Sequence, residues 1–118
     1  MINNIVAVQG NDLQKINLKS DTSIFLAYEA QNKNYKIFYY QPKDLSVINN
    51  KVFAYGNFVK FNYIKKKFFK IIKKKKLELT KSKFILIRQD PPFNLEYIST
   101  TYILDSIKTK VKIVNNPS

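Results

Sequence analysis

The sequence predicts an α/β domain with an open, mostly parallel sheet, and three short apolar runs carry this prediction. Residues 84–88 (FILIR) form an apolar run that ends in a charge, which is typical of a buried parallel strand at its carboxyl end. Residues 4–8 (NIVAV) and 36–40 (KIFYY) have the same strand character. A helical segment separates those two strands, so the chain opens with a β-α-β unit whose crossover should be right-handed.

The helix of this unit is predicted to run from residue 20 or 21 to about Lys33. Ser20 or Asp21 can cap its N-terminus, and Asn34 is a suitable left-handed residue to end it. Apolar residues at helical spacing supply the inward face: Ile24, Ala27 and Tyr28. Residues 42–45, which begin with a proline, then turn the chain.

A polar loop and a second helix follow the strand at residues 84–88. Pro91 and Pro92 lack N–H donors and cannot continue that strand inside a sheet. Asn94 offers an N-cap for a helix whose apolar face is at Leu95, Ile98 and Tyr102. Ligands of open α/β sheets usually bind in loops at the carboxyl ends of strands. Arg88 and Asp90 lie in this loop, and residues 111–114 (VKIV) give the last strand.

Residues 50–79 read as an insertion rich in aromatics and lysines. Alternating apolar residues on either side of Gly56 and Asn57 predict a β-hairpin that turns at this pair. The next piece, residues 64–76, fits either a basic amphipathic helix or a third strand.

Composition narrows the functional classes. The 118 residues fit one domain, and 45% hydrophobic residues argue against disorder despite a net charge of +13. With no cysteine and no histidine, disulfides and a zinc site are excluded, and Ser99 and Thr101 have no base to activate them. No Walker or dinucleotide glycine motif is present. No run approaches membrane-spanning length and no signal peptide is evident, so a cytoplasmic location is expected.

The lysines between Lys65 and Lys76, interleaved with Phe68 and Phe69, suggest a second functional class. Basic groups beside aromatics are typical of nucleic-acid surfaces. The simpler interpretation is a solvated edge strand whose lysines prevent pairing with other chains, and we favour it. A basic helix at a membrane surface is the weakest option, and an unrelated small α/β ligand-binding domain is also open.

Arg88 is the only arginine in the chain, and its planar fork suits a carboxylate or phosphate. It can clamp a substrate or simply pair with Asp90. In the first β-α connection, Lys19 can pair with a substrate carboxylate near a helix N-terminus. From the residues alone, capping and a solvated lysine explain that segment equally well. It contains Asn17, Lys19, Asp21 and Ser23.

Four stretches resemble bacterial glutathione synthetases. Residues 84–105 (FILIRQDPPFNLEYISTTYILD) closely resemble their motif R-x-D-P-P-F-(D/N)-x-x-(Y/F)-I-x-x-T-(Y/H)-(I/L)-L. Residues 16–23 (INLKSDTS) are similar to I-N-I-K-x-D-(S/T)-(S/T), and residues 29–31 match E-A-Q. Residues 114–117 (VNNP) are similar to V-N-x-P. The chain departs from the family at Gly10-Asn11-Asp12, where the family usually has Met-Asp-Pro.

The resemblance implies that residues 1–118 form one Rossmann-like, pre-ATP-grasp domain, with a small antiparallel meander whose third strand includes residues 64–76. This domain forms one wall of the active-site cleft in the family. The substrates would be γ-glutamylcysteine and glycine, joined at the expense of ATP through an acyl phosphate, with Mg²⁺ bound in the ATP-grasp portion. The resemblance implies substrate-binding roles, and no catalytic or metal-binding roles, for Asn17, Lys19, Asp21, Ser23, Arg88 and Asp90.

The family resemblance also sets expectations for the chain by itself. The ATP-grasp portion would begin where residue 118 ends, so the 118-residue chain alone is expected to bind neither ATP nor Mg²⁺ and to lack ligase activity. The full-length enzyme is expected to be a homo-oligomer. Nucleic-acid binding and membrane association are not expected.

Overall fold

The computed structural model describes residues 4–10, 22–61, 69–87 and 103–115; of residues 22–26 and of residue 115 only the backbone is described. In these residues one sheet of seven strands forms, with the order β3-β4-β2-β1-β6-β7, and β5 pairs with β4 outside this path. The predicted α/β class with a mostly parallel sheet is therefore confirmed. None of the helices in the described ranges is both long and apolar enough to span a membrane.

The parallel part of the sheet consists of the four strands predicted from short apolar runs. Both β2 and β6 pair with β1 in parallel, and β6 pairs in parallel with β7. β2 has the predicted bounds, whereas the observed bounds of the other three differ by one residue at one or both ends. The bounds are β1 Ile5–Gln9, β2 Lys36–Tyr40, β6 Phe84–Ile87 and β7 Lys112–Asn115.

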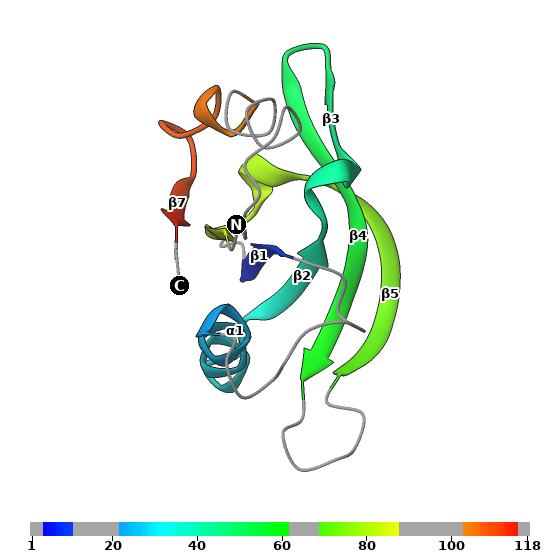
Figure 1. The fold of residues 1–118 in the computed structure, drawn as a ribbon, viewed down its shortest axis with the longest axis vertical. Coiled ribbons are helices and arrows are strands. Elements are labelled where there is room, and N and C mark those ends of the chain that lie inside the picture. The colour runs from blue at the N-terminus through cyan, green and yellow to red at the C-terminus, as the bar shows by residue number, and fades with distance from the viewer. Residues whose placement is uncertain (1–3, 11–21, 62–68, 88–102, 116–118) are drawn as a thin grey trace.

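The antiparallel part contains β3 (Leu45–Ile48), β4 (Lys51–Phe61) and β5 (Phe69–Glu78). β4 pairs with β3 through its first residues and with β2 through its later ones, while β5 covers its other edge. The pair β4 and β5 therefore curves around the end of the sheet (Figure 1). The meander is confirmed, and the strand interpretation of residues 64–76 holds for the part that lies in β5.

The predicted hairpin turn at Gly56 and Asn57 is wrong, because β4 continues through both residues. The chain turns instead at Asn49 and Asn50, whose φ angles of 51° and 64° are both left-handed. Two consecutive positive φ angles are what a tight hairpin turn requires, and asparagine tolerates them better than most residues.

Gly56 is required by close packing rather than by a turn. A Cβ atom at this position would overlap the backbone carbonyl oxygen of Tyr39 and lie 2.9 Å from the Cβ of Tyr40. It would also lie 3.0 Å from the Cζ of Phe38. Only glycine therefore allows β4 to approach β2 this closely.

Helical segments cover opposite faces of the sheet. α1 (Thr22–Asn32) packs through Ala27 and Tyr28 on the face that carries Val6 and Val8. Residues 103–105 are helical, and Leu104 and Ile107 pack on the other face. Adjacent residues of β1 point to opposite faces, so both faces of the parallel strands are buried. Most of the predicted second helix, from Asn94 to Tyr102, lies outside the described residues.

The C-terminus of α1 is fixed in place. Asn34 has a φ of 71°, which confirms the predicted left-handed stop. The side chain of Gln31 accepts a hydrogen bond from the backbone N–H of Phe61 (2.7 Å) and donates one to its carbonyl oxygen (3.0 Å). Gln31 therefore acts as a backbone-like partner for the last residue of β4. The predicted turn at residues 42–45 is a 3₁₀ turn, η2 (Pro42–Asp44).

Candidate functional site

The strand order reverses between β1 and β6. From β1 the chain passes through α1 to β2 on one side, whereas from β6 it passes to β7 on the other side. In open α/β sheets, ligands bind in the crevice at the carboxyl ends of the strands at such a reversal. The last residues of the two strands, Gln9 and Ile87, are directly paired. This point of the sheet is therefore the candidate substrate site, and we call it the switch-point edge.

Two sequence segments carry the predicted site residues, and each comes after a strand that ends at the switch-point edge. Arg88 comes directly after the last residue of β6, and the segment leading to Lys19 follows Gly10. The register thus pairs Gln9 with Ile87, the strand residues that precede the two segments. Ser23 is in the first turn of α1, where only its backbone is described. The other five predicted residues lie outside the described residues: Asn17, Lys19, Asp21, Arg88 and Asp90.

A buried polar pair stabilises the switch-point edge. The hydroxyl of Tyr40 donates a hydrogen bond of 2.9 Å to Oε1 of Gln9, and both side chains are almost wholly buried. Burial raises the pKa of the Tyr40 hydroxyl above its ordinary value, so the group stays protonated and remains a donor. The N–H of Gly10 also donates to the carbonyl oxygen of Tyr40 at 3.1 Å. These bonds fix the point where the chain leaves β1.

No sequence motif marks Gln9, Tyr39 or Tyr40 as site residues. One signal was present, because Gln9 is a polar residue that continues the apolar run of β1. A buried polar side chain needs a partner. That partner is 31 positions away, and only the parallel register of β1 and β2 brings it into contact.

The packing explains why glycine is present at position 10, where the chain departs from the family it resembles. A Cβ atom on Gly10 would overlap the hydroxyl oxygen of Tyr39 and lie 3.0 Å from its Cζ atom. Tyr39 itself is 5% exposed, so its ring cannot easily move aside. The tyrosine therefore occupies the space that a larger residue at position 10 would need.

We expect Gly10→Ala to destabilise the domain by about 1–3 kcal/mol through this overlap. In a Tyr39→Phe background the overlapping oxygen is absent, so the same change should cost at least about 1 kcal/mol less. Urea denaturation of the four proteins of this double-mutant cycle measures the coupling. An equal cost of Gly10→Ala in both backgrounds would show that Tyr39 does not constrain position 10.

The lysine-rich strand β5 has the features of a protected edge. Residues 70–76 of this strand are all exposed, and within the described residues only β4 pairs with it. The amino group of Lys76 lies 4.9 Å and 5.3 Å from the ring centroids of Phe53 and Tyr55. This agrees with the edge-strand interpretation. Lys65, Lys66 and Lys67 lie outside the described residues, and nothing in the described ranges supports a nucleic-acid module.

Metal-binding side chains do not cluster in the part of the chain that the structure describes. Within the four described ranges, no three side chains of aspartate, glutamate, histidine or cysteine lie close enough together to hold a metal ion. Magnesium is normally bound through carboxylates and phosphate oxygens.

Comparison with known proteins gives one consistent result. The family model described as "Prokaryotic glutathione synthetase, N-terminal domain" matches residues 5–118. The glutathione synthetase of Mesorhizobium japonicum is 35% identical over 113 residues, which cover 96% of this chain and 36% of the relative. That of Agrobacterium fabrum is 33% identical, with coverages of 96% and 35%. That of Buchnera aphidicola subsp. Baizongia pistaciae is 36% identical, with coverages of 90% and 33%.

The chain thus spans about a third of the length of the curated relatives it matches. The match covers every described strand, including both strands of the switch-point edge. The chain belongs to the prokaryotic glutathione synthetase family, as its N-terminal domain.

Proposed function

We propose that this chain is the substrate-side domain of a glutathione synthetase, the ATP-dependent ligase that joins γ-glutamylcysteine to glycine. The observation that carries the proposal is the family match over residues 5–118. The sheet supports it, because the two segments that contain the family's motifs start from paired residues at the switch-point edge. A domain with this arrangement can present polar side chains to one substrate from two loops.

Arg88 is proposed to bind a substrate carboxylate. Its guanidinium can donate two parallel hydrogen bonds to a carboxylate, which fixes both the position and the orientation of the group. Lys19 is proposed to add a second positive charge from the loop after β1. Four polar residues complete the proposed binding set: Asn17, Asp21, Ser23 and Asp90.

ATP and Mg²⁺ are proposed to bind in an ATP-grasp portion of the enzyme rather than to this chain. ATP would supply the energy of ligation by phosphorylating the substrate carboxylate. The role of this chain's own residues is to hold and orient γ-glutamylcysteine, so the 118-residue chain alone is proposed to be inactive. The homo-oligomeric state implied by the resemblance and the cytoplasmic location expected from the sequence stay predictions.

A chimeric enzyme tests the proposal. Residues 5–118 would replace the matching third of the Agrobacterium fabrum relative, and glutathione formation would be measured with γ-glutamylcysteine, glycine, ATP and Mg²⁺. We expect turnover that needs both substrates, and none from the 118-residue chain alone. A chimera that folds and binds ATP but makes no glutathione would contradict the proposed function. Turnover by the 118-residue chain alone would contradict its proposed inactivity.

A further inference from the structure

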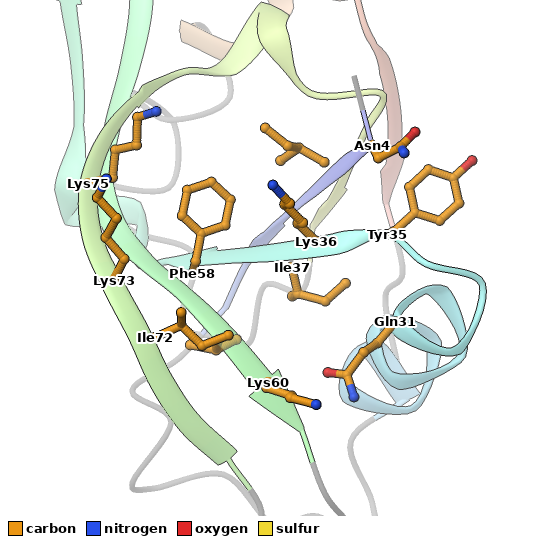
Figure 2. Close-up of a pocket in the computed structure, with 12 residues that line it drawn as sticks. Asn4, Gln31, Tyr35, Lys36, Ile37, Phe58, Lys60, Ile72, Lys73 and Lys75 are labelled. Atoms are coloured by element: carbon orange, nitrogen blue, oxygen red, sulfur yellow. The ribbon is translucent and has the colours of Figure 1, made fainter. Parts of the chain in front are cut away.

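A pocket lies at the edge of the sheet opposite to the switch-point edge. It has a volume of about 680 Å³ and is lined by residues at the amino ends of β1 and β2, including Ile5 and Lys36. β4 and β5 form one side of it, and the C-terminal turn of α1 adds Gln31 on the other (Figure 2). Its volume falls within the range of roughly 300–1,000 Å³ that is usual for small-molecule sites. We call it the amino-edge pocket.

Pairing between β4 and β5 determines which side chains line the amino-edge pocket. Phe58 pairs with Lys73, but Val59 pairs with Ile71, so Ile72 is the extra residue of a β-bulge. A bulge redirects a side chain, and Ile72, which is 61% exposed, lines the pocket. Alternation along β5 places Lys73 and Lys75 in the pocket lining, while Lys74 and Lys76 do not line it.

Hydrogen bonds connect the elements that line the amino-edge pocket. Gln31 joins α1 to the end of β4 through the two hydrogen bonds to Phe61 described above. The N–H of Lys36 donates a hydrogen bond of 2.6 Å to the carbonyl oxygen of Asn4. Both residues line the pocket, so this bond connects β2 to the start of β1 there. A preformed site loses less conformational freedom when a ligand binds.

The charge of the amino-edge pocket is unbalanced. Four lysines line it, none of the described lining residues is acidic, and no ion pair joins these lysines to any residue that the structure describes. Phe58, which is partly buried, and the exposed Ile72 give the lining an apolar part beside the four lysines (Figure 2). The four are Lys36, Lys60, Lys73 and Lys75.

We propose that the amino-edge pocket binds a small organic anion with a flat apolar body and at least one acid group. The body would lie against Phe58 and Ile72, and Lys36, Lys73 and Lys75 would hold the acid group. Charge complementarity favours an anion over a neutral ligand, and the apolar lining favours an organic anion over phosphate alone. The proposal does not rest on the function proposed above, because the substrate segments start at the opposite edge of the sheet.

Two fluorescent probes that differ by a single group test this proposal on the 118-residue chain. 8-Anilinonaphthalene-1-sulfonate has a flat aromatic body with a sulfonate, and N-phenyl-1-naphthylamine is the same body without the charge. We expect the sulfonate to bind more tightly, by roughly tenfold for one well-placed charge contact. Amide chemical-shift changes should map its binding to Ile37, Lys60 and Ile72.

Two double variants separate a built site from general electrostatic attraction. K73Q/K75Q removes two lysines from the pocket, and K74Q/K76Q removes the same charge from residues of the same strand outside the pocket lining. All four side chains are exposed, so both variants should fold. We expect K73Q/K75Q to raise the dissociation constant of the sulfonate roughly tenfold and K74Q/K76Q to change it less than about twofold.

Three results would overturn the proposal. Equal losses in the two variants would show non-specific attraction to a basic protein. Equal binding of the two probes would show that the sulfonate is not recognised. Chemical-shift changes confined to the exposed apolar residues Val47 and Ile48 of the β3–β4 hairpin would place the probe elsewhere.

Discussion

Gly56→Ala is expected to destabilise the domain by about 3 kcal/mol or more, the largest effect on stability that we expect from adding a single methyl group. The added Cβ would meet the backbone of β2 at Tyr39 and two buried side chains, Phe38 and Tyr40. A backbone carbonyl cannot move aside as the end of a side chain can. The two strands would have to separate, which would weaken the pairing of Tyr39 with Asn57.

Urea denaturation followed by far-UV circular dichroism would measure this loss. The free energy of unfolding of many domains is only about 5–15 kcal/mol, so this substitution would remove a large part of it. Lys51→Ala, at an exposed position of the same strand, is the matched control and should change stability by less than about 0.5 kcal/mol. If Gly56→Ala unfolds at the same urea concentration as this control, β4 and β2 are not packed as closely as described.

Arg88→Lys is expected to lower kcat/KM of the chimeric synthetase roughly a hundredfold, a loss of about 2.7 kcal/mol. Lysine keeps the positive charge but lacks the planar fork that can bind both oxygens of a carboxylate. Turnover at varied γ-glutamylcysteine would measure the effect, with the loss specific to this substrate and small for glycine. This prediction rests on the role proposed for Arg88.

Lys83→Gln is the control for this experiment. Lys83 precedes β6, so the change removes a positive charge next to the opposite end of the strand that Arg88 follows. Its amino group lies over the rings of Tyr35 and Phe84, at the amino end of β6. Activity should stay within about twofold of the parent chimera. Equal losses for the two variants would mean that Arg88 acts only through overall charge.

The strands of the parallel sheet could be predicted because each is a short apolar run bounded by polar residues. Residues 36–40 form β2 as predicted, and the left-handed conformation of Asn34 follows from local backbone preference alone. The segments that carry Lys19 and Arg88 could be placed at strand ends for the same reason. Local sequence thus predicted the four parallel strands and indicated the edge of the sheet from which the candidate site segments start.

The hairpin turn could not be placed from local sequence. A Gly-Asn pair is a common turn signal, but Gly56 is needed because β2 lies against it, and that neighbour is 16 to 18 positions earlier in the chain. The hairpin turns instead at Asn49 and Asn50, which adopt the left-handed conformation although neither is a glycine. The pair Gln9 and Tyr40 and the amino-edge pocket were also missed, because each is formed by residues brought together only by strand pairing.

The position of β1 between β2 and β6 constrains how the domain can fold as it is synthesised. β1 and β2 are complete once about forty residues have been made, but the second neighbour of β1 ends at Ile87. During the intervening elongation one edge of an apolar strand has no native partner. Such long-range parallel pairing is slow to form and favours aggregation while it is incomplete. Chaperone dependence during synthesis should therefore be greatest before Phe84–Ile87 emerges from the ribosome, and should fall once β6 has paired with β1.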